Sequence, residues 1–264
     1  MGFVAIIWID VSLGLKKSSG GLETGGAEIH NGFSRVGLTF LGETMDYKTR
    51  VDIFINVHKG LRLGLLSLAL KIGRMDWSDE EEVKSVGEEF ATLLHFLREH
   101  AINEDEIQFP LLESRAPSIT QKDRREHRKL EKALNQLEKD WVGILSNPDR
   151  SKLGYQFYLA YNRFLSGYLA HMDREENDVT AAFYKNFADP EIEAGFQKII
   201  ARTPLADVIM MMEYMIPAMN GDERYTFLSK LKASAPPEAY RQIKDLSQKV
   251  LAHRDWQKLS ARLG

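Results

Sequence analysis

Apolar residues recur at spacings of three and four along four long segments of the chain, which is the spacing of one face of an α-helix. These segments span residues 46–73, 79–114, 120–146 and 151–187. Short polar breaks separate them, and no segment shows the sustained alternation of polar and apolar residues that is typical of a half-buried strand. The pattern therefore predicts an all-α protein.

Each segment carries one apolar stripe that should face a common core. Short breaks between long helices favour antiparallel neighbours, so we expect an up-down-up-down four-helix bundle. The predicted stripes, in chain order, are Phe54, His58, Leu61, Leu65, Leu68 and Ile72; Val86, Phe90, Leu93, Leu97, His100, Glu104, Ile107 and Leu111; His127, Leu130, Leu134, Leu137, Trp141 and Leu145; and Phe157, Tyr161, Phe164, Tyr168, His171, Glu175, Val179 and Ala182.

The chain divides into three parts by its pattern. Residues 1–44 are glycine-rich and lack a sustained period, which predicts a loose N-terminal extension, and Met45 offers an alternative first residue of the working protein. Residues 45–188 form the predicted bundle. Residues 189–264 contain shorter helical segments and form a predicted C-terminal helical extension, in which the methionine-rich stretch 210–219 is interpreted as core packing.

Six polar residues interrupt the stripes at positions where a core should be apolar. Each segment contributes a histidine, and the second and fourth segments add a glutamate four residues later, on the same helix face. A buried carboxylate without a partner is costly, and no lysine or arginine occupies the stripes nearby. A bound metal is therefore favoured over a self-satisfied polar core. The candidate ligands are His58, His100, Glu104, His127, His171 and Glu175.

Composition limits the kind of metal site. The chain has no cysteine, which excludes disulfides, thiolate zinc sites and cysteine-ligated iron–sulfur clusters. Imidazole and carboxylate ligands suit iron or manganese, and also zinc. Because carboxylates can bridge two ions, six ligands predict a pair of metals more naturally than a single one.

Charge and hydropathy indicate which partners to expect. The net charge is −3 and both signs are interspersed, so we predict no nucleic-acid partner. No apolar run is long enough to span a bilayer, and we predict no membrane partner. These features favour a cytoplasmic protein, and they identify no protein partner.

Several other polar residues are interpreted as bystanders. His95 falls off the stripe of its segment, His253 has no carboxylate neighbour in the pattern, and His30 lies in the N-terminal extension. Glu131 follows His127 by four residues but flanks the stripe. We interpret it as a solvated charge, with a further metal ligand as the alternative.

The residues that flank the six candidate ligands predict a tightly filled core. Leu61, Leu97, Leu130 and Phe164 lie there, together with Tyr168, whose hydroxyl could donate a hydrogen bond to a ligand. A core packed to native density leaves room for a diatomic molecule and excludes larger substrates.

Four blocks of the sequence resemble the hemerythrin-like, HHE cation-binding family. They read VHKGLR (57–62), HAINEDEIQFP (100–110), EHRKLEKAL (126–134) and HMDREENDV (171–179). The resemblance implies a non-haem centre with two iron ions that Glu104 and Glu175 bridge. It also implies binding of oxygen or of a related diatomic such as nitric oxide.

The chain departs from the family pattern in three respects. Glu131 stands where oxygen-carrying members have a fifth histidine, the fourth segment lacks the Phe-Pro pair, and no cysteine-containing N-terminal module is present. Two alternatives to a diatomic-binding protein therefore stay open. One is a di-iron enzyme that reduces nitric oxide or peroxide, and the other is an iron- or oxygen-responsive regulatory protein.

Overall fold

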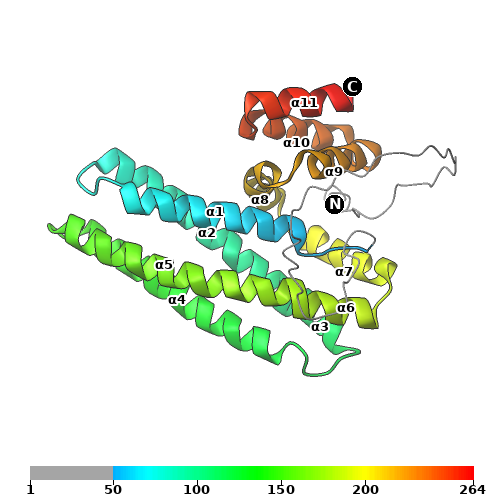
Figure 1. Cartoon of the computed structure of the whole chain (residues 1–264), viewed down its shortest axis with the longest axis horizontal. Coiled ribbons are helices and arrows are strands. Elements are labelled where there is room, and N and C mark those ends of the chain that lie inside the picture. Colours follow the sequence, from blue (N-terminus) through cyan, green and yellow to red (C-terminus); the bar gives the residue numbers. More distant parts are fainter. Residues whose placement is uncertain (1–49) are drawn as a thin grey trace, which may run out of the picture.

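The protein is helical throughout residues 50–264, the part that the computed structural model describes (Figure 1). No strand occurs in that part, so the all-α prediction is confirmed. The predicted N-terminal extension, Met45 and His30 lie outside the described residues. The helices are α1 (Ile55–Arg74), α2 (Glu80–Asn103), α3 (Phe109–Glu113), α4 (Gln121–Leu145), α5 (Arg150–Arg174), α6 (Thr180–Asn186), α7 (Asp189–Arg202), α8 (Leu205–Ala218), α9 (Gly221–Ser234), α10 (Pro237–Val250) and α11 (His253–Leu263).

Helices α1, α2, α4 and α5 lie side by side and form the body of a helical bundle (Figure 1). Helix α1 packs on α2 and α5, and α4 packs closely on α5 but only sparsely on α2. An aromatic cluster fills the bundle near the α1–α2 connection, where Trp141 and Phe157 contact each other and both contact Trp77 and Phe90. The close α4–α5 contact and the sparse α2–α4 contact shape the candidate site described below.

The first helix begins later than the sequence pattern predicts. It starts at Ile55, and Phe54 is the N-cap residue whose carbonyl accepts the first helical hydrogen bond, from the His58 N–H. The predicted start near residue 46 lies outside the described residues. The side chain of Asp52 accepts hydrogen bonds from the backbone N–H groups of Phe54 and Ile55, at 2.8 and 2.9 Å. This carboxylate satisfies amides that would otherwise be unpaired at a helix start.

Two π-helical turns interrupt the bundle at matching places. The turn η1 (Glu104–Gln108) joins α2 to α3, and η2 (Glu175–Val179) joins α5 to α6. Each turn begins at one of the two candidate glutamates. A π turn accommodates one extra residue, so it rotates every later side chain relative to an uninterrupted α-helix.

This rotation corrects the predicted stripes beyond each glutamate. Ile107 and Leu111 are only half-buried, whereas Gln108, Phe109 and Leu112 are buried. After η2, Val179 is buried as predicted, but Phe183 takes the core position expected for Ala182; at the end of α4, Ile144 similarly replaces Leu145. A regular period of 3.6 residues cannot anticipate the shifts at the π turns.

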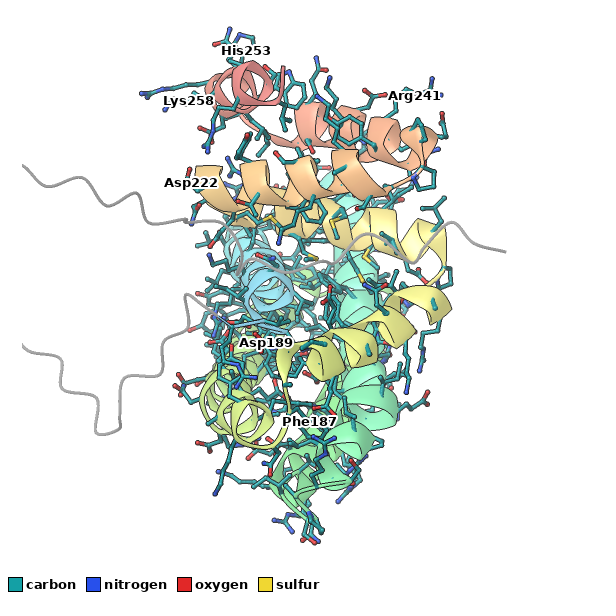
Figure 2. All side chains as sticks on the ribbon, turned by 90° about the vertical axis from the view of Figure 1, so that its right-hand side faces the viewer. Phe187, Asp189, Asp222, Arg241, His253 and Lys258 are labelled. Carbon is teal, nitrogen blue, oxygen red and sulfur yellow. The ribbon has the colours of Figure 1, made fainter. Side chains whose placement is uncertain are left out.

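The C-terminal helices form a second layer on one side of the bundle, with α8 lying against α1. Figure 2 shows this layer, with the labelled residues Asp222, Arg241, His253 and Lys258 on its outer side. Within α8, the methionines Met211, Met212 and Met215 are buried, as core packing predicts.

Two glycines in α1 permit the close approach of α8. A Cβ atom at Gly60 would lie 2.8 Å from Met215 Cγ, and one at Gly64 would lie 3.0 Å from the Tyr214 ring. Larger side chains at these positions would force the two helices apart. Within residues 50–264, none of the helices has both the length and the apolar character needed to cross a membrane.

Candidate metal centre

The six candidate ligands meet in the interior of the bundle, between α1, α2, α4 and α5. Each is buried, with exposed fractions between 0 and 6%. They form two overlapping groups whose ligand atoms all lie within 4.8 Å of one another. One group contains His58, His100, Glu104 and Glu175, and the other contains Glu104, His127, His171 and Glu175.

The two glutamates belong to both groups because each points its two oxygens in different directions. Glu104 Oε1 lies 3.2 Å from His100 Nε2, while its Oε2 lies 3.2 Å from His127 Nε2. Glu175 Oε2 lies 3.6 Å from His58 Nε2, while its Oε1 lies 2.9 Å from His171 Nε2. Each carboxylate therefore offers one oxygen to either group.

The ligand spacing suits metal ions. Metal–ligand bonds of about 2.1 Å place opposite ligands about 4.2 Å apart, so small side-chain rotations close each group on an ion. All four oxygens of Glu104 and Glu175 are buried without a hydrogen-bond partner. Unpaired buried carboxylate oxygens are costly, and two cations would compensate them. The residues present therefore fit a pair of metals.

Comparison with known proteins agrees with this geometry. A sequence profile described as the hemerythrin HHE cation-binding domain matches residues 49–183, which is about half of the chain and contains all six candidate ligands. The chain belongs to the hemerythrin HHE family. No curated protein and no solved structure matches it. Membership of a cation-binding family and the buried histidine–glutamate cluster together indicate a metal-binding protein.

Acidic side chains behind three of the four histidines complete this HHE domain, and sequence reasoning missed them. His58 Nδ1 lies 2.9 Å from Glu176, which Arg62 holds through hydrogen bonds of 2.5 and 2.9 Å. His127 Nδ1 lies 3.2 Å from Asp105. An acid at Nδ1 fixes the ring tautomer and orients Nε2 toward the metal position.

The third acid belongs to a more extended network. His171 Nδ1 lies 3.4 Å from Glu126, and Arg174 contacts both Glu126 and Asp123. A signal for all three acids is present in the sequence: Asp105 and Glu176 each directly follow a candidate glutamate, and Glu126 directly precedes His127.

His100 has different surroundings. Among residues 50–264, no carboxylate lies within ion-pairing distance of its Nδ1 atom. The ring borders a cavity of about 40 Å³ that Asn103, Gln108 and Val57 also line. The side-chain oxygens of Asn103 and Gln108 are buried without a hydrogen-bond partner. A cavity of this size accommodates a water molecule, since one needs only about 10–15 Å³.

Protonation of the cluster reflects its burial and crowding. Burial and the neighbouring Glu175 raise the pKa of Glu104. Burial opposes the charged form of His127, yet the acids Asp105, Glu104 and Glu175 raise its pKa to about 12. Burial and the neighbouring His58 hold the pKa of His100 well below its usual range. Without metal, His127 therefore binds a proton more strongly than an ordinary histidine, and His100 binds one more weakly.

Aromatic rings shield two of the histidines from solvent. Phe54 stacks on His58 with ring centroids 4.9 Å apart, and Phe109 stacks on His127 at 5.3 Å. Phe109 is the phenylalanine of the Phe-Pro pair in the second block. Each phenylalanine ring covers one face of a candidate ligand.

The residues interpreted as bystanders lie away from both groups. His95 is exposed and pairs with Asp207 at 2.9 Å, and His253 is exposed at the outer C-terminal layer (Figure 2). Glu131 is exposed and contacts Arg98 on α2, as expected for a solvated charge. The Tyr161 hydroxyl donates a hydrogen bond to the Leu65 carbonyl at 3.0 Å, which is a structural role.

One flank of the site is more open than the predicted packed core. A groove of about 420 Å³ runs between α2 and α4 and reaches His127 and Tyr168. Leu130, predicted to fill this flank, is only half-buried. Arginine contacts, rather than interlocked leucines, join α4 to α2 and to η1 here, and they leave space between the helices.

Proposed function

We propose that this protein binds two non-haem iron ions and, through them, oxygen or a related diatomic such as nitric oxide. The observation that carries the proposal is the double orientation of Glu104 and Glu175, each with one oxygen in either ligand group. Each ion would take two imidazole nitrogens and two carboxylate oxygens from the chain. The bound irons would supply exchangeable positions for a small ligand and one-electron redox chemistry.

The chain itself holds and shields the centre. The acids behind His58, His127 and His171 keep each Nε2 free to bind metal. Phe54 and Phe109 exclude water from two histidines, which slows side reactions of bound ligand. Orienting the ligands and excluding water are roles that a binding protein needs.

Iron content is the direct test. Protein purified from iron-replete cells should contain two irons per chain by elemental analysis, and azide or nitric oxide should change its visible spectrum. A preparation that binds one metal, or none, under these conditions would contradict the proposal. If elemental analysis found zinc or manganese at full occupancy, the metal site would be supported and the proposed iron chemistry would be contradicted.

A regulatory role is a second candidate, and one contact favours it. Arg202 on α7 lies 2.6 Å from Glu106 within the turn η1, so the C-terminal layer contacts the segment that begins with Glu104. Metal occupancy could thereby influence the outer helices. A partner protein captured only by the iron-loaded or only by the iron-free form would support this role. Electron-donor-dependent consumption of nitric oxide or peroxide would instead indicate an enzyme.

A further inference from the structure

The groove between α2 and α4 has walls suited to a hydrocarbon chain. Aliphatic side chains from both helices line it, and its volume of about 420 Å³ is typical of small-molecule sites. The ring of Tyr168 reaches it from α5, and the imidazole of His127 reaches it from α4. The aliphatic lining consists of Leu97, Ala101, Ile102, Leu130 and Leu134.

Two arginine contacts frame the groove and hold it open. On one side, Arg98 of α2 binds Glu138 of α4 through hydrogen bonds of 2.9 and 2.6 Å and also contacts Glu131. On the other side, Arg124 of α4 binds the carbonyl and carboxylate of Asp105 in η1, at 3.0 and 3.2 Å. The space between the helices is thus a built feature and not a packing defect.

The rim of the groove carries uncompensated positive charge. Arg98 pairs with both Glu131 and Glu138, which leaves one acid in excess there, and Asp105 pairs with Arg124 and His127. Arg128 and Lys132 are exposed, lie one turn apart on α4, and have no acidic partner within residues 50–264. An anionic group placed at this rim would meet two cations that no acid neutralises.

The inner end of the groove offers a polar group. Tyr168 is 3% exposed, and it lines the groove. A tyrosine at this place offers a ring to an apolar ligand and a hydroxyl to a polar one. His127 lies at the same end, so an occupant of the groove would end beside the candidate metal centre.

We propose that this groove binds an aliphatic monocarboxylate. The carboxylate would lie at Arg128 and Lys132, and the hydrocarbon chain would follow the leucines toward Tyr168. Apolar walls with a cationic rim match such an amphipathic anion and disfavour a cation or a fully polar ligand. Binding needs only the groove, so this proposal stands or falls separately from the iron chemistry.

Calorimetry with three probes of equal chain length tests the ligand class. Octanoate, 1-octanol and octylammonium should be titrated into the full chain as purified, with its metal content measured. Octanoate should bind most tightly, octanol about tenfold more weakly, which is the effect of losing the charge contacts, and octylammonium not measurably. Equal affinity for octanoate and octanol, or no octanoate binding, would overturn the proposal.

Variants locate the binding. Arg128→Glu combined with Lys132→Glu should weaken octanoate binding about tenfold or more. The matched control, Lys122→Glu with Lys129→Glu, reverses two exposed charges of α4 outside the groove and should leave binding unchanged. Ala101→Trp should block the groove while metal content stays the same. Equal losses in the rim and control variants would reject the groove as the site.

Discussion

The two helices that carry a histidine and a glutamate, α2 with η1 and α5 with η2, are alike along the chain and differ in their surroundings. Both read His-x-x-x-Glu followed by an acid, and both enter a π turn at the glutamate. Behind His171 lies Glu126, whereas His100 borders a cavity and no acid. Local sequence therefore sets the backbone, and the facing helix sets the environment of each histidine.

One position accounts for this difference. Glu126 is the residue before His127 on α4, and its counterpart before His58 on α1 is Val57. Val57 lines the cavity beside His100, so it occupies the place from which an acid could reach that ring. Of the four histidines in the two ligand groups, three therefore have an acid at Nδ1, and His100 has only neutral outer neighbours.

The largest effect should follow from removing a shared ligand. Glu104→Ala and Glu175→Ala should each lose both metals, because each carboxylate has an oxygen in either group. His58→Ala, His100→Ala, His127→Ala and His171→Ala should each lose about one. Elemental analysis per chain measures this, with His95→Ala and His253→Ala as unchanged controls. Equal losses from glutamate and histidine variants would contradict the bridging arrangement.

Stability without metal should separate a ligand from a structural polar residue. Chelation should lower the melting temperature of the wild type, because metal binds only the native state. Glu104→Leu should lose metal, yet its metal-free form should be at least as stable as the metal-free wild type, because one of two neighbouring buried carboxylates is removed. Melting curves with and without chelator report both effects. A destabilised Glu104→Leu protein would instead indicate a self-satisfied polar core.

Substitutions beside His127 and beside His100 should change the rate of metal release in opposite directions. Asp105→Asn removes the acid behind His127 and should weaken metal binding about 10- to 100-fold. Val57→Glu should give His100 the acid that it lacks and slow the faster phase of release. Stopped-flow chelation that resolves two phases measures both. A single phase in the wild type would mean that the surroundings of His100 do not distinguish the two positions.

The smallest effect should come from the contact between η1 and the C-terminal layer. Arg202→Ala removes an exposed ion pair with Glu106, worth about 0–1 kcal/mol. Its melting temperature should stay within a few degrees of the wild type. Arg62→Ala, the corresponding change next to η2, should cost more, because Glu176 also orients His58. The ratio of the two effects measures how differently the two π turns are anchored.

Sequence alone predicts the helices and the positions of the six candidate ligands, because a helical period places residues of the i, i+4 pattern on one face. His100 and Glu104 illustrate this, since both are buried on the inner face as the period predicts. The same period fails after each glutamate, where a π turn moves Gln108 into the core in place of Ile107. The groove could not be predicted either, since its width depends on how Arg98 and Arg124 hold two helices apart.

Helix α1 is buried on two sides, and this limits the local unfolding that could move its candidate ligand His58. Its residues pack inward on α2 and α5, while Gly60 and Gly64 bring α8 onto its outer side. Amide hydrogens of α1 should therefore exchange with solvent among the slowest in the described chain, and α9 to α11 should open first. His58 thus sits on a helix protected by the C-terminal layer, and local fluctuations of that layer need not disturb it.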